Sequence, residues 1–346
     1  MKSEKINLKK LFNKNFILII SALILFCLLS VVMFNDLSHY FSLFFKGNEA
    51  AFKQVVLIKK MVENTPSIIY YPFKLVIEIL RITLAPIILI FIYNSNFKEK
   101  IKIFLSFIFI LILLCISSQE QINSILIVFA CALLIVKLYP NYSKVFMIIG
   151  SILIILFVTF GLVTFSGIDD FDRMSQVLQA YFSGPSNVAL GITIGRSKAL
   201  DFFLGDFFRN IPIFATFFKN MIVTNDYMNI VGSLSGGASI TPFISDGYIY
   251  FGKILSILPT MVITYIIIKL EKNLYNNNYD VYTYFIRSIS IIIIALCPVL
   301  YSVGIFYSYI MSIIIPINIL DYIRTNVLKI SFDKEGLHNA YKKISN

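Results

Sequence analysis

The sequence predicts an all-α integral membrane protein, a polytopic bundle of transmembrane helices that forms a single domain over residues 1–346. Hydrophobic residues make up 58% of the chain, and the mean hydropathy is +0.82. The apolar residues gather in runs of roughly 20, which is the length of a helix that crosses a bilayer. These runs show no strand-like alternation that would indicate a barrel, and a bilayer leaves backbone groups no other partner, so we expect helices.

About eight apolar runs are long enough to be spans, and ten is the upper bound. The predicted spans are 15–34, 75–94, 103–118, 123–139, 145–166, 247–269, 283–300 and 302–320. The first run is too long for a cleavable signal peptide, and no small-x-small cleavage site follows it.

The distribution of lysine and arginine predicts the orientation of the chain. With alternating spans, 17 of the 30 basic residues fall on the side of the N-terminus and 10 on the other side, in much longer loops. Because basic loops stay in the cytoplasm, both termini are expected on the cytoplasmic side of the membrane. The net charge of +11 is then explained by topology and by contact with anionic membrane lipids, and nucleic acid is not an expected partner.

One long polar stretch, 167–247, interrupts the apolar runs and is predicted to be a large loop outside the membrane. Within it, 196–220 carries seven phenylalanines between widely spaced charges, which is typical of an interfacial or re-entrant helix pair. The outer segment 35–74 also contains a stretch with helical spacing of apolar residues. Both segments are expected to lie on or dip into the membrane surface.

The outer loop carries the residues best suited to bind a phosphate group. Arginine donates paired hydrogen bonds from a planar, permanently charged group, and this geometry matches phosphate. The three candidates are Arg173, Arg196 and Arg209. The alternative is that these arginines pair with acidic residues of the same loop, such as Asp206.

Two charged residues, Glu78 and Arg81, stand three apart in the second predicted span and should pair on one helix face. Charges at membrane depth are usually functional, but Glu78 is expected only about a turn inside the outer boundary, so a self-neutralised surface pair is equally open. Lys253 is expected one or two turns below the same surface.

Metal and cofactor sites are not predicted, because the residue types that build them do not cluster. All four cysteines lie in apolar runs, and the two histidines, His39 and His338, fall on opposite sides of the membrane. Tryptophan is absent, so tyrosines such as Tyr250 are expected to anchor the chain at the interface.

Two segments resemble a known family. These are YFSGPSNVAL at 181–190 and ITPFISDGYIYFGKILSILP at 240–259. They are similar to the bacterial oligosaccharide repeat-unit polymerases, the Wzy-type polymerases of O-antigen or capsular polysaccharide. The similarity includes an arginine followed by a glycine after ten residues, Arg173 and Gly184. It covers about 165–270, and family members often have ten or more spans.

The resemblance implies a glycosyltransferase that works on the outer face of a bacterial cytoplasmic (inner) membrane. We expect it to need no metal, because the arginines could do the work of a divalent ion and no ligand cluster is visible, and no cofactor is expected. It would move a growing chain from undecaprenyl diphosphate onto a new lipid-linked repeat unit, in the biosynthesis of lipopolysaccharide or capsule, and a chain-length regulator protein is a further expected partner. Asp246 falls on the acidic position of the family pattern and would be the base, assisted by Arg173. The alternative for Asp246 is a cap of the following helix. Expected substrate-binding residues are Arg196, Arg209, Tyr181, Gly184, Tyr248, Lys253 and Arg81.

Two other functions are compatible with the sequence. An O-antigen ligase has the same architecture, but a histidine is expected in its large outer loop, and His39 lies in the wrong loop. A repeat-unit flippase or another transporter would show more spans, short loops and an internal duplication, and no repeat is visible.

Overall fold

The computed structural model describes the helical parts of the chain. The described residues are 6–41, 59–115, 121–144, 148, 185–194, 198–209, 211, 217–218, 220–224, 227, 242–300 and 302–326. Within them, every regular element is a helix, as the sequence predicts. Apart from residue 148, the predicted span 145–166 lies outside the described residues, as does most of the loop 167–247. The number of spans therefore stays a prediction.

Three described helices are long and apolar enough to cross a membrane: α2 (Lys14–Met33), α4 (Ser67–Asn94) and the last helix (Val303–Asn326). The last helix comprises α15 (Val303–Tyr309), a π-helical turn η3 (Ile310–Ile314) and a further α-helical part. The outward face of α2 is strongly apolar, with Leu18 63% and Val32 80% exposed. An apolar surface of this kind suits contact with lipid tails rather than water.

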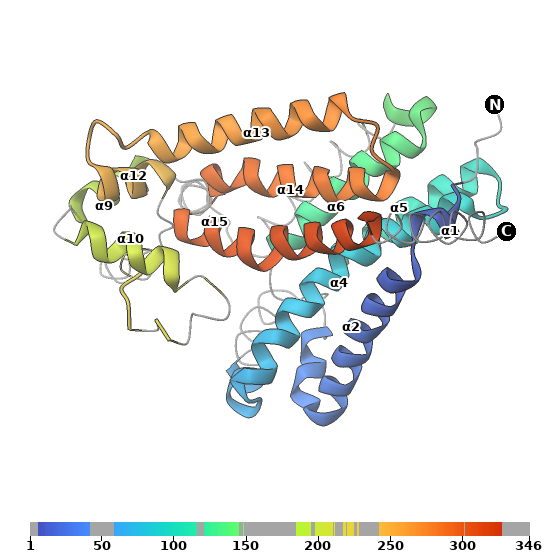
Figure 1. Ribbon diagram of the computed structural model, residues 1–346, viewed down its shortest axis with the longest axis horizontal. Coiled ribbons are helices and arrows are strands. Elements are labelled where there is room, and N and C mark those ends of the chain that lie inside the picture. The colour runs from blue at the N-terminus through green and yellow to red at the C-terminus, as the bar shows by residue number, and fades with distance from the viewer. Residues whose placement is uncertain are drawn as a thin grey trace, which may run out of the picture.

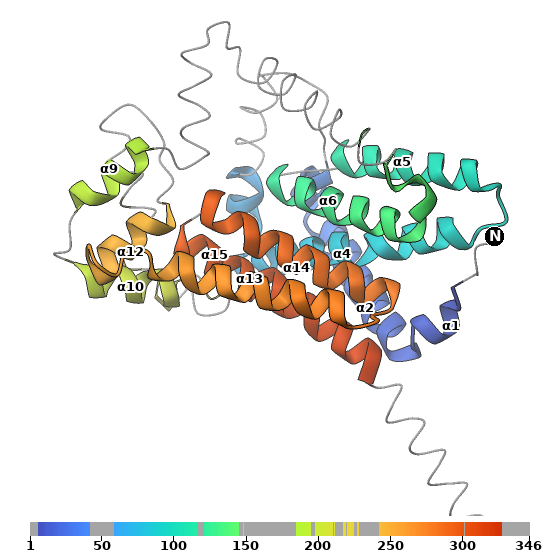
Figure 2. The same cartoon turned by 90° about the horizontal axis from the view of Figure 1, so that it is seen from above.

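The other described helices complete the bundle. They are α1 (Leu8–Leu11), η1 (Asn35–Phe41), α5 (Glu99–Cys115), α6 (Gln121–Leu138), η2 (Pro140–Tyr142), α9 (Pro185–Ile194), α10 (Ala199–Phe208), α12 (Phe243–Phe251), α13 (Leu258–Asn276) and α14 (Val281–Leu300). Figure 1 shows α13, α14 and the last helix side by side, with α9, α10 and α12 gathered at one end of them. Helices α5 and α6 lie beside this group, as Figure 2 shows from above.

Helix α14 forms the centre of the bundle, and its sequence explains why. Its fully buried residues are Tyr282, Phe285, Ile286, Ile289 and Ile293, which recur at helical spacing along one face. Residues three, four and seven apart share a face of an α-helix, so they form a continuous apolar stripe. This stripe lets α14 contact α4, α6, α13 and the last helix.

The start of α2 and the end of the last helix lie at the same end of the bundle. Asn13 accepts a hydrogen bond from the N–H of Phe16 and donates to the carbonyl oxygens of Ile323 and Arg324. Arg324 also donates to Asp280, which precedes α14. These three segments were predicted to share one side of the membrane because of their basic residues, and the structure places them together. Which face of the membrane they meet stays a prediction.

One predicted span is divided in the structure. The run 247–269 was expected to be a single helix, but α12 ends at Phe251 and α13 begins at Leu258. Gly252 adopts a φ of 84°, which residues with a side chain rarely tolerate, and Pro259 occupies the first turn of α13. The two apolar stretches are therefore a short helix and a longer one joined by a turn.

Helix α4 is longer than its apolar run. It begins at Ser67 rather than 75, which places Glu78 about three turns inside the helix instead of about one. The predicted pairing is confirmed, because Arg81 Nη1 lies 2.9 Å from Glu78 Oε1. Glu78 is only 4% exposed, so the pair is not on the surface.

Candidate functional site

The candidate site is a cluster of four buried polar residues at the end of the bundle where α10, α12 and the last helix meet. The cluster consists of Asp206, Thr224, Asp246 and Tyr250, and none of the four is more than 8% exposed. We call it the carboxylate cluster. Two carboxylates that share a dry environment are unusual in proteins and often mark a functional site.

Asp206, on α10, accepts hydrogen bonds from three donors. Its Oδ1 accepts from the backbone N–H of Thr224 at 3.1 Å. Its Oδ2 accepts from the hydroxyls of Thr224 and of Tyr250. An ionised carboxylate can accept at every lone pair and has no proton of its own to place, so this arrangement of donors suits the charged form.

Asp246, on α12, has a different environment. It is completely buried, and its Oδ2 accepts a hydrogen bond of 2.7 Å from the N–H of Val303. Its Oδ1 has no hydrogen-bond partner among the residues that the structure describes. Burial raises the pKa of Asp246 well above its usual range. The negative charge of Asp206 raises this pKa further, while the hydrogen bond from Val303 opposes the shift. The cluster therefore holds one carboxyl group suited to keep or exchange a proton beside another that suits the charged form.

Local sequence explains how Asp246 reaches this position. Pro242 precedes the first turn of α12 and leaves Phe243 as the first helical residue. Asp246 therefore does not cap the helix that follows it, which was the alternative expected from the sequence. It caps the last helix instead, where the free N–H groups of a helix N-terminus favour a carboxylate.

Glycines bring the helices of the site into close contact. A side chain at Gly247 would collide with the backbone carbonyl of Ser256, and one at Gly205 with the carbonyl of Ile222. Gly191 of α9 lies directly against Ser245 of α12 in the same way. Contacts this close are possible only where a residue has no side chain. Gly191 therefore sets the packing of α9 on α12, while Gly205 and Gly247 hold α10 and α12 against the non-helical residues Ile222 and Ser256.

Aromatic side chains surround the cluster. The ring of Phe203 contacts Tyr250 edge to face at 5.5 Å, and the ring of Phe207 stacks on Tyr307 at 4.5 Å. These contacts join α10 to α12 and to the last helix. The two carboxylates are buried, with Asp206 3% and Asp246 0% exposed, and exclusion of water strengthens electrostatic interactions inside a site.

The structure places five of the predicted site residues. Asp246 is at the centre of the cluster, and Tyr248 is half-buried on the same helix beside Tyr250. Arg209 follows α10, one turn after Asp206, and its Nη1 donates to the carbonyl of Met221 at 3.4 Å. Lys253 is exposed in the turn between α12 and α13. Arg81 belongs to α4 and pairs with Glu78, so the structure does not bring it into the cluster.

The other predicted site residues, Arg173, Tyr181, Gly184 and Arg196, lie outside the described residues. Three members of the cluster were not proposed as site residues from the sequence. Asp206 was treated as a partner for arginines, Tyr250 as an interfacial anchor, and Thr224 was not considered. Tyr250 is 8% exposed, so the expectation of an anchor at the membrane surface is wrong for this residue. Its place after Asp246 on α12 was the available signal, since residues four apart share a helix face.

No metal centre is visible in the described part of the chain. Among those residues, no group of three or more histidine, cysteine, aspartate or glutamate side chains could hold a metal ion. Cys27 and Cys131 are buried as free thiols in the apolar core.

Comparison of the chain with protein-family models, with curated proteins and with solved structures gave no match.

Proposed function

We propose that the chain is a membrane glycosyltransferase that polymerises lipid-linked oligosaccharide repeat units on the outer face of the bacterial cytoplasmic membrane. The observation that carries this proposal is the carboxylate cluster. Asp246, near the end of the 167–247 segment, has a raised pKa and an oxygen with no hydrogen-bond partner in the described part of the chain. A general base needs a pKa close to the pH at which it works, and burial is a common way to achieve this.

In the proposed reaction the hydroxyl of an acceptor sugar attacks the anomeric carbon of the donor chain. The new glycosidic bond forms as the bond to undecaprenyl diphosphate breaks, and Asp246 takes the proton of the hydroxyl. The diphosphate leaves with the bonding electrons, and cationic side chains stabilise its charge. Arg173, Arg196 and Arg209 are proposed for this task, and Tyr181, Gly184, Tyr248 and Lys253 for binding the substrate.

Asp206 has a supporting part in this proposal. Its negative charge disfavours ionisation of Asp246 and so makes Asp246 a stronger base once it has lost its proton. The hydroxyls of Thr224 and Tyr250 hold Asp206 in place. Asp246 is completely buried. In this proposal, the side chains packed around it move apart when substrate binds, so that the acceptor hydroxyl reaches its Oδ1.

Deletion of the gene in the cell of origin tests this function without knowledge of the sugar. A polymerase is required for long surface polysaccharide, so its loss should leave single repeat units attached to their carrier and no long chains. Return of the wild-type gene should restore the chains. Long chains of normal length in the deletion strain would contradict the proposal.

A repeat-unit transporter is the second candidate, and the same cluster favours it. Protonatable carboxylates inside a helical bundle are typical of proteins that couple transport to a proton gradient. The deletion strain separates the two, because loss of a flippase leaves the lipid-linked repeat unit on the cytoplasmic face, out of reach of an impermeant glycosidase. Loss of a polymerase leaves it on the outer face, where the enzyme cleaves it.

A further inference from the structure

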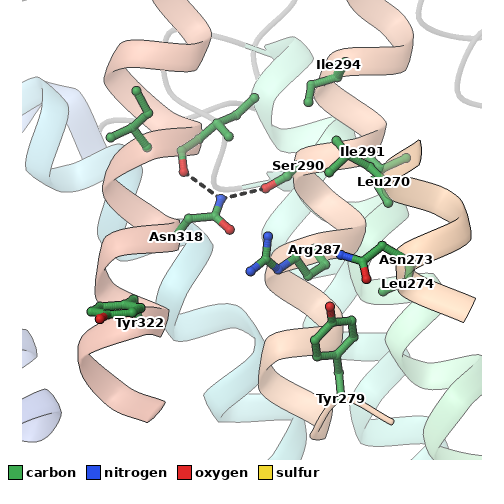
Figure 3. A pocket seen from close by; sticks show the side chains of 12 residues that line it. Leu270, Asn273, Leu274, Tyr279, Arg287, Ser290, Ile291, Ile294, Asn318 and Tyr322 are labelled. Atoms are coloured by element: carbon green, nitrogen blue, oxygen red, sulfur yellow. Dashed lines mark hydrogen bonds between the residues drawn. The ribbon is translucent and has the colours of Figure 1, made fainter. Parts of the chain in front are cut away.

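A separate cavity lies at the other end of α13, α14 and the last helix, away from the carboxylate cluster. Its volume is about 320 Å³. Its apolar wall consists of residues Leu270, Leu274, Ile291, Ile294, Ile314 and Ile315. Figure 3 shows the polar side chains that line it, among them Arg287 and Asn318, which face each other from α14 and the last helix.

Among the described residues, no carboxylate forms an ion pair with Arg287. Its Nε is buried without a hydrogen-bond partner, and its contact in the described residues is with the ring of Tyr279, 5.9 Å from the guanidinium carbon. Two other described arginines are different, since Arg81 pairs with Glu78 and Arg324 with Asp321. A guanidinium that is partly removed from water and lacks a carboxylate favours the binding of an anion.

The last helix is irregular where it borders this cavity. Its π-helical turn, η3, ends at Ile314, which lines the cavity. Asn318 donates from Nδ2 to the carbonyl of Ile314 at 2.7 Å and to Ser290 at 3.1 Å, and its buried Oδ1 has no partner among the described residues. Turns of this kind are rare and often accompany functional sites in helices. The π-helical turn is therefore a second indication of a binding site, and it does not depend on the charge of Arg287.

The lining of the cavity is polar at one end and apolar at the other. Arg287 and Tyr279 lie toward the turn that joins α13 to α14, whereas Ile294 and Ile314 lie further along their helices. An occupant that fits both parts has an anionic head and a hydrocarbon chain. Basic pockets between membrane helices bind phosphate-bearing lipid headgroups for this reason.

We propose that this cavity, the Arg287 cavity, binds an anionic phospholipid. The headgroup phosphate pairs with the guanidinium of Arg287, and an acyl chain lies along the isoleucines of α14 and the last helix. This lipid is a component of the surrounding membrane and is distinct from the diphosphate-linked substrate of the proposed reaction. Binding stabilises the packing of α14 against the last helix, and the proposal does not depend on the function of the carboxylate cluster.

The test measures the melting temperature of the full-length protein in detergent, titrated with three probes. The probes are dioleoyl phosphatidylglycerol, phosphatidylcholine with the same chains, and inorganic phosphate. Phosphatidylglycerol should raise the melting temperature in a saturable way, and the other two should have much smaller effects. An equal shift with phosphatidylcholine would overturn the requirement for an anion. An equal shift with inorganic phosphate would overturn the assignment of a lipid to this cavity and indicate a site for a small anion.

Single substitutions test whether phosphatidylglycerol binds at Arg287. Arg287→Gln should weaken the apparent affinity for phosphatidylglycerol by about tenfold or more, since it removes one charge-assisted pair. Lys272→Gln is the matched control, because Lys272 is an exposed cation near the same end of α13 and should leave the affinity unchanged. Without lipid, Arg287→Gln should melt no earlier than wild type, because it removes an unpaired cation. Wild-type affinity in Arg287→Gln would refute the proposal.

A second variant tests the apolar wall with Arg287 kept in place. Ile291→Phe adds volume inside the cavity and should weaken phosphatidylglycerol binding while the protein still folds. Unchanged binding in this variant would show that the lipid does not enter between α13 and the last helix, and would overturn the assignment of the acyl chain to this wall.

Discussion

Asp246 and Val303 are joined by a hydrogen bond of 2.7 Å, although 57 residues separate them in the sequence. The carboxylate Oδ2 accepts from the first N–H of the last helix, which ties α12 to the start of a helix that is long enough to cross the membrane. Ser302 accepts a second hydrogen bond at the same helix start, from the N–H of Ile305. One residue therefore combines a structural role with the free oxygen that the proposed chemistry needs.

The two roles of Asp246 can be separated by substitution. Asp246→Asn keeps an acceptor for the N–H of Val303, so its melting temperature should be close to that of wild type. Asp246→Ala removes the acceptor and should destabilise the protein by roughly 0.5–2 kcal/mol, the usual cost of losing a helix cap. In cells, both variants should lose long polysaccharide, because loss of a general base costs roughly 100-fold or more in rate. Long chains of normal length with the asparagine variant would leave Asp246 a structural cap only.

Stability should depend on pH through Asp246. Its pKa is raised in the folded chain, so the folded state binds this proton more tightly than the unfolded state. The resulting stabilisation is fully present below the unfolded pKa of about 3.9 and is lost as the pH rises through the raised pKa. The melting temperature of wild type minus that of Asp246→Asn should therefore decrease as the pH rises through this window, because only wild type loses a stabilising proton. A difference that grows with pH would show that the ionised form is the one that the fold stabilises.

Sequence patterns predicted the helices but not the polar contacts between them. The predicted runs 15–34 and 283–300 agree with α2 and α14 to within two residues, because a long apolar run in a membrane protein has no alternative to a helix. The break after α12 was missed because apolar residues on both sides conceal Gly252. The contact of Asp206 with Tyr250 joins residues 44 apart. It depends on how α10 packs against α12, which local periodicity does not encode.

The close approach at Gly247 should make α12 intolerant of a side chain there. Gly247→Ala places a methyl group against the carbonyl of Ser256 and should destabilise the protein by about 1–3 kcal/mol, the typical cost of overpacking. Ile244→Ala serves as the control on the same helix, because Ile244 is 43% exposed. Thermal unfolding in detergent measures both. Equal melting temperatures for the two variants would contradict the close contact.

Arg324 should contribute strongly to stability. Its guanidinium bonds to Asp321, Asp280 and the carbonyl of Leu11, and its side chain is 2% exposed. Arg324→Ala leaves the buried Asp321 without its counter-charge and should cost about 3–5 kcal/mol. Arg324→Lys should recover only part of this, since one ammonium cannot reach all the partners of a planar guanidinium.

The control for this prediction is Lys269→Ala, which removes an exposed cation from α13. It should change the melting temperature little, because exposed charges contribute little to stability. A melting temperature of Arg324→Ala equal to that of this control would show that the contacts of Arg324 are not needed to hold α1, the start of α14 and the last helix together.

Labelling of single cysteines can determine which face of the membrane each end of the bundle meets. Ile254, in the turn after α12, is 90% exposed, and Asn277, at the opposite end of α13, is also exposed. In a background without the native cysteines, Ile254→Cys should react with an impermeant thiol reagent in intact cells whose outer barrier is permeabilised. Asn277→Cys should react only after the cytoplasmic membrane is broken, since basic loops stay inside. The reverse pattern would place the carboxylate cluster on the cytoplasmic side, where a polymerase of lipid-linked repeat units could not meet its substrate, and would exclude the proposed function.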